Sequence, residues 1–334
     1  MPLPRVLTIG VLLLWVGATV GWCPLAYAEP FAFITNQKAN TVSVVDTATR
    51  RVVKTIAVGK EPAGVGVSRD GSRVCITNPG GKSMTLIDGK RLEVVGDLPL
   101  GDGPLGIAVD PDGSRAYVAD WYQHQFSVVD LRELKSVKQI AVGRSPGGVA
   151  VSADGRRVYV ANRDDDSVSA IDAGSLEVTR TVRVGRHPFG VTLNSGGDRL
   201  FVANVESNDV SIVDTAQMAV LKTVAVGDRP YAAALGANES KAFVTNQYDN
   251  TISVIDTAAG AVVGNVAVGD YPEGIAASPG GKWVYVANWF SNTVSVVNAE
   301  TLELETSIPT GDGSRAFGAF VAGGHASEPK TGGW

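Results

Sequence analysis

The sequence has little of what usually marks a catalytic or metal-binding protein. It contains three histidines and two cysteines in 334 residues. No HxH, HExxH or paired Cys/His spacing occurs, so no transition-metal site is expected. No CxxCH motif occurs either, which excludes covalently attached c-type haem. No GxSxG elbow or glycine-rich phosphate loop stands between a strand and a helix. We therefore expect no cofactor and no metal, and no motif assigns a catalytic residue.

Long hydrophobic runs are absent except at the N-terminus. Arg5 precedes an apolar run at residues 6–16, and Ala26-Tyr27-Ala28 offers a small-x-small cleavage site. Residues 1–28 are thus predicted to be a cleaved signal peptide, because the run is short for a membrane span. Cys23 is disfavoured as a lipidation site, since Val20-Gly21-Trp22 lacks the residues that usually precede one. The mature protein is expected to be periplasmic or secreted.

Charge and cysteine content restrict the partners and the means of stabilisation. The formal net charge is −5, which argues against nucleic acid as the main partner because phosphate binding needs a basic surface. Cleavage of the leader would leave Cys75 alone, so no intramolecular disulfide is expected. Burial must then stabilise the fold, and Cys75 is expected to be a buried, inert thiol.

What the sequence does have is a repeat of 42 residues. Seven units align without gaps, and they start at Ala32, Val74, Ala116, Val158, Leu200, Ala242 and Val284. In the sixth unit, strand signals lie at residues 242–245, 251–255, 261–268 and 274–278. Turn sequences separate them. Short strands at this period predict an all-β, seven-bladed β-propeller of four-stranded antiparallel blades.

Several columns recur in nearly every unit and are expected to serve folding. The first is Asn36, Asn78, Asp120, Asn162, Asn204, Asn246 and Asn288; the second is Asp46, Asp88, Asp130, Asp172, Asp214, Asp256 and Asn298. Both are expected to form Asx-turns. The third is Gly59, Gly101, Gly143, Gly185, Gly227, Gly269 and Gly311, expected to supply backbone angles that side chains forbid. The fourth is Pro62, Pro104, Pro146, Pro188, Pro230 and Pro272, where no ladder bond is made.

A column of small residues follows the prolines. It comprises Gly66, Ala108, Ala150, Thr192, Ala234, Ala276 and Gly318. We expect these residues to let seven backbones approach closely at the axis of the ring.

The units resemble the repeats of YVTN-family β-propellers. Tyr159-Val-Ala-Asn162, Asn250-Thr-Ile-Ser-Val-Ile-Asp256 and Val268-Gly269 followed by Pro272 match the family pattern. The likeness covers about residues 31–324. It implies that the last strand of each unit is innermost, and it implies a link to extracytoplasmic redox systems, including quinoprotein dehydrogenases.

The order of strands predicts how the ring closes. The first strand expected in the mature chain, at Ala32, corresponds to the second strand of a blade counted from the axis. The last expected strand, near residues 316–321, corresponds to an innermost strand. The C-terminal strand should therefore pair with the N-terminal blade. We expect a propeller over residues 29–322, a disordered tail over 323–334 and a monomer, because a closed propeller has no need to oligomerise.

Function is expected where the units differ. The residues flanking the proline column open the innermost strand, so they should surround the channel mouth. In the last four units they are titratable or aromatic: His187, Phe189, Arg229, Tyr231, Tyr271, Glu273 and Arg315. Such a cluster around a concavity predicts a ligand-binding site. The alternative is a solvated rim without function.

Two loops on the same face carry large aromatic residues. They are Trp121, Tyr122, Trp289 and Phe290, and they predict an interaction surface, with packing over the strand ends as the alternative. Asp164-Asp165-Asp166 offers oxygen ligands for calcium. Its spacing matches no loop that wraps an ion, so a solvated acidic loop is preferred.

Two functions remain open. The first is a ligand-binding or protein-interaction module whose partner is an unknown protein or small molecule. The second is an enzyme or a cofactor-binding oxidoreductase component, since propellers of similar architecture include lactonases and haem d1 domains. A lactonase would use His187 or Glu273 as base and Arg229 with Arg315 to stabilise the oxyanion. His187 is also the candidate axial ligand for haem d1. Convergence of these side chains on one point would favour the enzyme.

Overall fold

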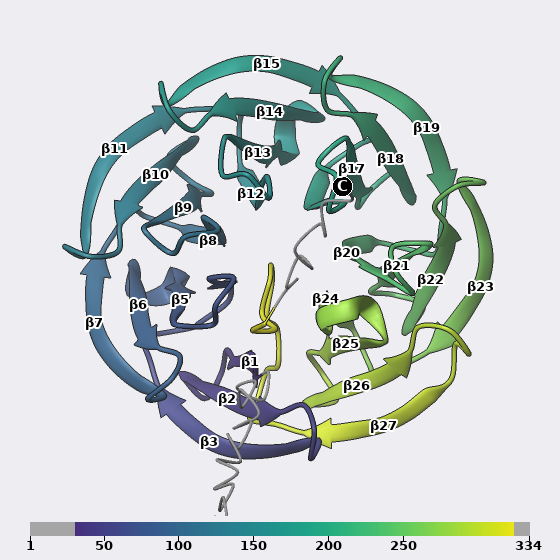
Figure 1. The fold of residues 1–334 in the computed structure, drawn as a ribbon, viewed down its shortest axis with the longest axis horizontal. Helices are drawn as coiled ribbons and strands as arrows, with labels where there is room; N and C mark the ends of the chain where they lie inside the picture. Colours follow the sequence, from purple (N-terminus) through teal and green to yellow (C-terminus); the bar gives the residue numbers. More distant parts are fainter. Residues whose placement is uncertain (1–30, 324–334) are drawn as a thin grey trace, which may run out of the picture.

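The computed structural model describes residues 31–323 and shows a ring of seven antiparallel sheets (Figure 1). The prediction of an all-β, seven-bladed propeller is confirmed. The predicted signal peptide, and the predicted tail apart from residue 323, lie outside the described residues. Within the described part, no helix is long and apolar enough to cross a membrane.

Each blade is a meander of consecutive strands. The first blade holds β1 (Phe31–Asn36), β2 (Thr41–Asp46) and β3 (Arg51–Ala57). The second to fourth hold β4 (Val65–Val67), β5 (Arg73–Asn78), β6 (Ser83–Asp88), β7 (Glu93–Pro99), β8 (Pro104–Val109), β9 (Arg115–Asp120), β10 (Gln125–Asp130), β11 (Lys135–Ala141), β12 (Pro146–Val151), β13 (Arg157–Asn162), β14 (Ser167–Asp172) and β15 (Glu177–Arg183).

The fifth to seventh blades follow the same order. They hold β16 (Pro188–Leu193), β17 (Arg199–Asn204), β18 (Asp209–Asp214), β19 (Ala219–Ala225), β20 (Pro230–Gly236), β21 (Lys241–Asn246), β22 (Thr251–Asp256), β23 (Ala261–Ala267), β24 (Pro272–Ala277), β25 (Trp283–Asn288), β26 (Thr293–Asn298) and β27 (Leu304–Pro309). Single 3-10 turns lie at η1 (Pro79–Gly81), η2 (Arg163–Asp165) and η3 (Pro279–Gly281).

The four strands predicted in the sixth unit correspond to β21, β22, β23 and β24. The proline column opens five innermost strands, at Pro104, Pro146, Pro188, Pro230 and Pro272. A proline is tolerated there because the first residue of a strand can lack a donor. We call the face that carries the β1–β2 type hairpins and the loops before these prolines the upper face. The opposite face, which carries the hairpins between the two inner strands of each blade, is the lower face.

The last described segment lies beside β1 but does not form a regular fourth strand of the first blade. Residues 314–322 form isolated bridges at Ala32–Val321 and Asn36–Ser314. The backbone N–H of Phe33 also donates to the carbonyl of Phe320 at 2.9 Å. Positive φ angles at Ala316 (61°) and Gly318 (92°) interrupt the extended backbone that a continuous strand needs.

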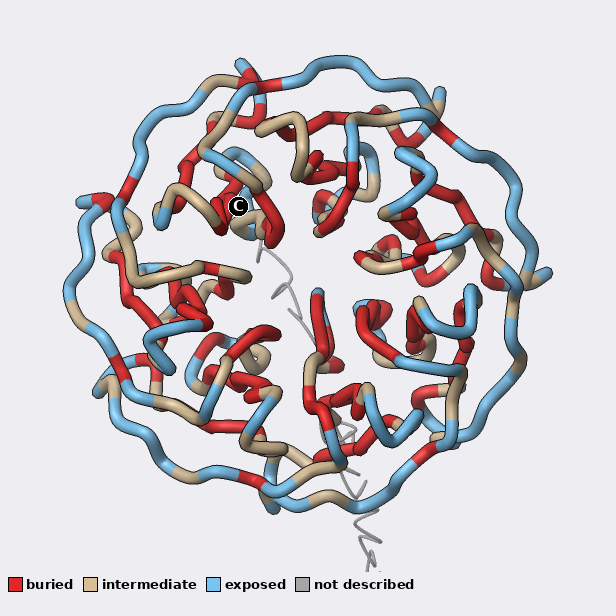
Figure 2. Tube along the Cα trace, turned by 180° about the vertical axis from the view of Figure 1, so that it is seen from behind, coloured by how far each residue is buried: buried red, intermediate tan, exposed pale blue. Residues whose placement is uncertain are grey.

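Burial decreases from the inner strands to the outermost one (Figure 2). The second and third strands are buried almost throughout, while the outer strands such as β11 are exposed at most positions. Hydrophobic side chains of neighbouring blades fill the space between the sheets, as Phe126 and Ile171 do between the third and fourth blades. Cys75 is buried as predicted, and burial raises the pKa of its thiol.

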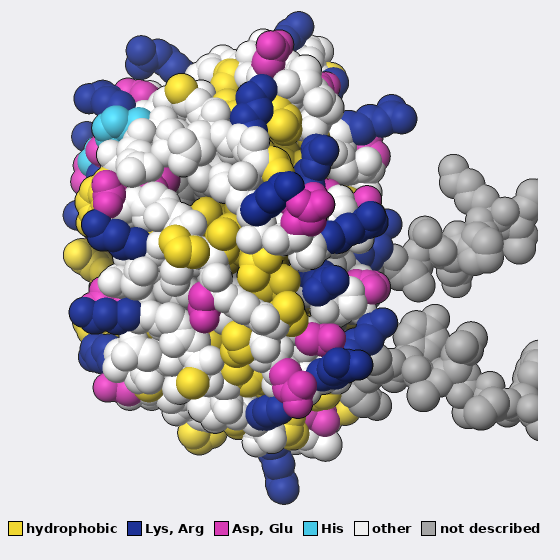
Figure 3. All heavy atoms as spheres, turned by 90° about the vertical axis from the view of Figure 1, so that its left-hand side faces the viewer, with side chains coloured by type: hydrophobic (Ala, Val, Ile, Leu, Met, Phe, Trp, Pro, Cys, Tyr) yellow, Lys and Arg dark blue, Asp and Glu magenta, His cyan; other side chains and the backbone are white. Residues whose placement is uncertain are grey.

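The outer strands leave apolar side chains in solvent. Val95 of β7 and Val137 of β11 are about half exposed, at 53% and 46%. Figure 3 views the ring from this side and shows hydrophobic side chains in a broken band between the two faces.

The two Asn/Asp columns play different roles. The second column forms the expected Asx-turns: the carboxylate of Asp46 accepts the backbone N–H groups of Ala48 and Thr49 at 2.9 and 2.8 Å. The first column mostly does not, which corrects our expectation. The buried amide of Asn36 instead donates to the hydroxyls of Thr41 and Ser43, both at 2.9 Å, and so joins β1 to β2.

The glycine column also needs a corrected explanation. None of its seven members has a positive φ. A Cβ at Gly227 would instead lie 2.6 Å from Cγ of Asn246 in the next blade, and one at Gly311 would lie 2.5 Å from Cγ of Asn36. Each glycine is therefore required because a buried residue of the first column, Asp120 at Gly101 and Asn at the other six, packs directly on it. The contact from Gly311 to Asn36 joins the last blade to the first.

The small-residue column is not where the backbones are closest. The tightest approach is two residues earlier, where a Cβ on Gly106 would lie 2.0 Å from the carbonyl oxygen of Gly147. Ala108, Ala150 and Thr192 instead line an open cavity on the axis. The small side chains thus set the width of a channel rather than a backbone contact.

Candidate functional site

Three of the predicted site residues are held in a left-handed conformation on the upper face. His187, Arg229 and Tyr271 have φ angles of 52°, 55° and 56°. Each backbone N–H donates to a side-chain oxygen of the preceding hairpin: Asp166 at 2.9 Å, Asn208 at 3.0 Å and Asn250 at 2.9 Å. The loops that carry these side chains are therefore fixed by the neighbouring blade.

Glu273 and Arg315 form an ion pair at the centre of the upper face. Nε of Arg315 donates to one carboxylate oxygen of Glu273 at 2.6 Å, and the guanidinium also reaches the other at 3.2 Å. The amide of Gln247 donates to that carboxylate at 3.0 Å. Glu273 is 2% exposed, and this burial raises its pKa, although the charge of Arg315 opposes the rise. Both groups are committed to each other rather than presented to a substrate.

Aromatic rings close the channel beneath the upper face. Phe189 stacks on Tyr231 with ring centroids 4.1 Å apart, and Phe317 lies 5.3 Å from Phe189 and 5.2 Å from Tyr231. Phe189 and Phe317 are buried. Burial, with the nearby charge of Glu273, raises the pKa of the Tyr231 phenol. Phe189 and Tyr231, predicted to surround the channel mouth, thus belong to a layer of packed aromatic rings.

A separate polar cluster surrounds Glu206, a residue that the sequence analysis did not single out. Nδ1 of His187 lies 2.9 Å from a carboxylate oxygen of Glu206, and guanidinium nitrogens of Arg163 and Arg229 lie 4.0 Å from the same oxygen. Glu206 belongs to one of the variable hairpin loops, so its position, though not its role, could be read from the repeat.

Four rings form a second group, which we call the aromatic patch: Tyr248, Tyr271, Trp289 and Phe290. Neighbouring centroids lie 4.7 to 5.8 Å apart. Tyr248 and Phe290 are each 56% exposed. Cations stand over two of the rings, with Arg229 5.2 Å from the centroid of Tyr248 and Arg315 5.1 Å from that of Trp289. Tyr248 was also missed from the sequence, although it lies in a variable loop.

The four predicted surface aromatics separate into two kinds. Tyr122 and Phe290 are exposed, at 68% and 56%. Trp121 packs on Phe189 at 6.3 Å between ring centroids, and Arg163 lies 5.6 Å from the Trp121 ring. Trp289 stacks on Phe290 at 4.7 Å. The two tryptophans are therefore packed against other rings, whereas Tyr122 and Phe290 are exposed.

The predicted site residues are close together in the fold but do not converge on one point. His187 and Arg229 face Glu206, Glu273 and Arg315 face each other, and Phe189 with Tyr231 fills the channel. Asp164 accepts the hydroxyl of Ser145 at 2.6 Å and the guanidinium of Arg163 at 2.6 Å. Among residues 31–323, no group of three His, Cys, Asp or Glu side chains is arranged to hold a metal ion.

Comparison with known proteins supports the architecture. Residues 85–226 match the family model described as lactonase, seven-bladed β-propeller, and residues 201–317 match the cytochrome D1 heme domain. Each match spans less than half of the chain. No curated protein sequence matches. The chain is thus a seven-bladed β-propeller, parts of which are similar to the lactonase and cytochrome D1 heme domain models.

Solved structures share this fold at low identity. Hydrazine synthase of Kuenenia stuttgartiensis aligns with a TM-score of 0.72 and 23% identity, over 81% of this chain and 92% of that one. A functionally unknown protein from Desulfotomaculum acetoxidans gives 0.73 and 17%, over 86% and 99%. The dihydro-heme d1 dehydrogenase NirN gives 0.65 and 16%, over 85% and 74%. At these identities the likeness extends to the fold alone.

Proposed function

We propose that this propeller is a protein-interaction module and that its upper face binds the partner through the aromatic patch. The carrying observation is that Tyr248 and Phe290 are each 56% exposed although they belong to a connected set of rings. Tyr, Trp and Arg are enriched at the centres of protein interfaces, where aromatic rings supply large contact areas. Arg229 lies beside the rings and adds a charged donor.

The patch is also prepared for binding before a partner arrives. Tyr271 is fixed by its bond to Asn250, and Trp289 donates its backbone N–H to the carbonyl of Tyr271 at 3.0 Å. Side chains that are already ordered lose less conformational entropy on association. The sealed channel mouth beside the patch leaves a broad face rather than a deep pocket, which favours a macromolecular partner.

We extend the proposal to location and partner. The signal-peptide pattern at residues 1–28 supports a periplasmic or secreted protein. Similar structures include proteins named as a hydrazine synthase and a dihydro-heme d1 dehydrogenase. The partner proposed here is accordingly a component of an extracytoplasmic redox system.

Site-specific photo-crosslinking in the native host tests this proposal. A crosslinker in place of Tyr248 should give one dominant adduct with an extracytoplasmic redox protein. The same group in place of Arg156, an exposed residue of the lower face, should not. Phe290→Ala should weaken the adduct at least several-fold, whereas Val95→Ala on β7 should leave it unchanged. Equal adducts from both faces, or none from Tyr248, would refute the proposal.

Lactone hydrolysis is the second candidate. It is favoured by the match of residues 85–226 to the lactonase model and by the contact of His187 with Glu206 inside that range. Here His187 would act as base, Glu206 would orient it and Arg229 would stabilise the oxyanion. His187→Gln should then lower the hydrolysis rate of five- and six-membered lactones by about 100-fold. Absence of hydrolysis by the parent protein would dismiss this candidate.

A further inference from the structure

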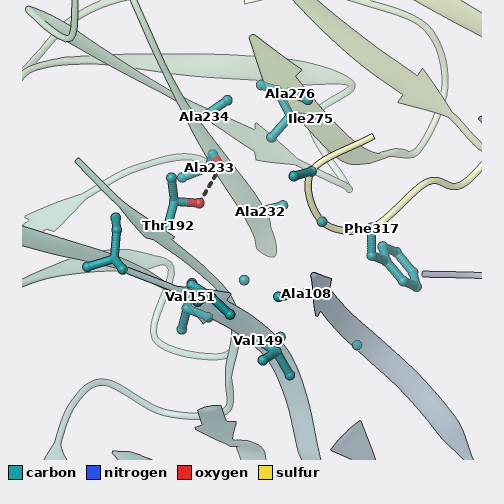
Figure 4. Close-up of a pocket in the computed structure, with 18 of the residues that line it drawn as sticks. Ala108, Val149, Val151, Thr192, Ala232, Ala233, Ala234, Ile275, Ala276 and Phe317 are labelled. Atoms are coloured by element: carbon teal, nitrogen blue, oxygen red, sulfur yellow. Dashed lines mark hydrogen bonds between the residues drawn. The ribbon is translucent and has the colours of Figure 1, made fainter. Parts of the chain in front are cut away.

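A cavity of about 360 Å³ lies on the axis of the ring below the aromatic layer (Figure 4). Phe189 and Phe317 are part of its wall, whereas Tyr231, Glu273 and Arg315 are not. The cavity therefore reaches the rings of Phe189 and Phe317 but does not extend to the ion pair on the upper face. Its volume is within the range of small-molecule sites, about 300–1,000 Å³.

Most side chains in the wall are apolar, and backbone atoms of the inner strands contribute polar surface between them. It is built from the inner strands β8, β12, β16, β20 and β24, with side chains such as Ala108, Val151 and Ile275 (Figure 4). The hydroxyl of Thr192 donates its proton to the carbonyl of Ala233 at 2.7 Å, so that proton is not available to a ligand. Among the described residues that line the cavity, Glu239 alone carries a charge.

Glu239 lies where this cavity meets a second one of about 170 Å³ beside the lower-face hairpin at η3. The two cavities share Leu235, Glu239, Ala277 and Val321 in their walls. The carboxylate accepts the backbone N–H and the hydroxyl of Ser195, each at 2.8 Å. Neither donor is a cation, so the negative charge at this opening is not neutralised by a partner in the wall.

The backbone that places Glu239 is unusual among the blades. Ala237, Asn238 and Glu239 have consecutive φ angles of 49°, 53° and 64°. In the equivalent hairpins of the third and fourth blades, Gly113 and Gly155 adopt the left-handed conformation instead. Such angles are costly for residues with a Cβ, and strained backbone of this kind gathers at binding sites.

We infer that the channel binds an amphiphile from the lower face, with its apolar chain in the axial cavity and a cationic ammonium head beside Glu239. An aliphatic wall favours an apolar chain. A lone carboxylate at the opening attracts an ammonium group and repels a carboxylate. This site is independent of the aromatic patch on the upper face, so failure of one proposal leaves the other standing.

Isothermal titration calorimetry on the full-length protein distinguishes the contribution of the ligand's alkyl chain from that of its head group. Decylammonium should bind at one per protein, about tenfold more tightly than decanoate. Butylammonium, which has the same charge and a short chain, should bind much more weakly because it buries less apolar surface. Glu239→Gln should reduce the preference for decylammonium over decanoate to about twofold or less.

Variants that fill the cavity test its location. Ala108→Trp should abolish decylammonium binding. If that variant does not fold, Val151→Trp on a neighbouring strand replaces it and should have the same effect. Tyr122→Ala on the upper face is the control and should bind as the parent does. Equal affinity for decanoate and decylammonium in the parent protein, or unchanged binding in a folded filled variant, would overturn the inference.

Discussion

The contact between the glycine and asparagine columns makes a quantitative prediction at Gly269. A Cβ there would lie 2.7 Å from both Cγ and Nδ2 of Asn288 and 2.8 Å from its Cβ. Asn288 is fully buried, and its amide donates to Thr293 at 3.1 Å and Ser295 at 2.9 Å. Gly269→Ala must therefore displace a side chain that has no room to move.

The cost follows from two effects. Overpacking of a filled interior destabilises by about 1–3 kcal/mol. Loss of one or both amide hydrogen bonds adds about 1 kcal/mol for each. We expect Gly269→Ala to lower the free energy of unfolding by about 2–5 kcal/mol. Gly197→Ala is the matched control: Gly197 has a φ of 69° but nothing lies within 4 Å of its added Cβ, so we expect a cost of only about 1–2 kcal/mol.

Urea unfolding monitored by tryptophan fluorescence measures both values. A double-mutant cycle with Asn288→Ala tests the mechanism, because an alanine at 288 leaves room for the new methyl group. Gly269→Ala should then cost at least about 1 kcal/mol less in the Asn288→Ala background. A Gly269→Ala protein as stable as the parent, or strictly additive effects, would refute the steric explanation.

Three further predictions concern the pair at the centre, the ring junction and the Asx-turns. Arg315→Ala should destabilise the protein by about 3–5 kcal/mol in thermal unfolding, because it leaves the buried Glu273 unpaired; Arg229→Ala should cost less than about 1 kcal/mol. Asn36→Ala should cost about 1–3 kcal/mol, because the side-chain Oδ1 of Asn36 accepts the backbone N–H of Gly311 at 3.0 Å where the last blade meets the first; a melting curve like that of the parent would contradict this. Hydrogen bonds from backbone N–H groups hold the pKa values of Asp88, Asp130 and Asp172 below their ordinary value. The stability that these carboxylates contribute is therefore present above about pH 4, and it is lost as the pH falls through their pKa values in the folded protein. The triple Asp→Asn variant should keep the turns, as Asn298 does naturally, and its stability should fall less than that of the parent between about pH 4 and pH 2; equal slopes would show that these turns do not contribute.

The repeat could predict the ring because each blade needs the same contacts. Recurrence of Asn, Gly and Pro at one period shows that these positions serve every blade. It does not show which residue touches which. Recurrence of glycine predicts a special backbone conformation, yet Gly227 is constrained by Asn246 of the next blade. The glycine and asparagine columns recur with the same period. The sequence therefore does not reveal whether the two residues contact each other or are each required for a separate reason.

The candidate site was harder to predict, for a physical reason. Of the residues that follow the prolines, Phe189 lines the axial cavity, whereas Glu273 does not. What these side chains do depends on partners from other blades: Arg315 pairs with Glu273, and Phe317 packs on Phe189. Sequence spacing places side chains at the same radius but does not reveal whether they leave an opening or close it.

The two ends of the channel differ because different units depart from the repeat. At the upper end, large rings at Phe189, Tyr231 and Phe317 meet across the axis and seal it. At the lower end, the column of small residues continues, and one hairpin replaces the usual turn glycine with Glu239. The sealed end can offer only a surface to a partner, while the open end offers a volume and a charge. The two binding proposals therefore rest on departures from the repeat at opposite ends of the ring, and each can be tested without the other.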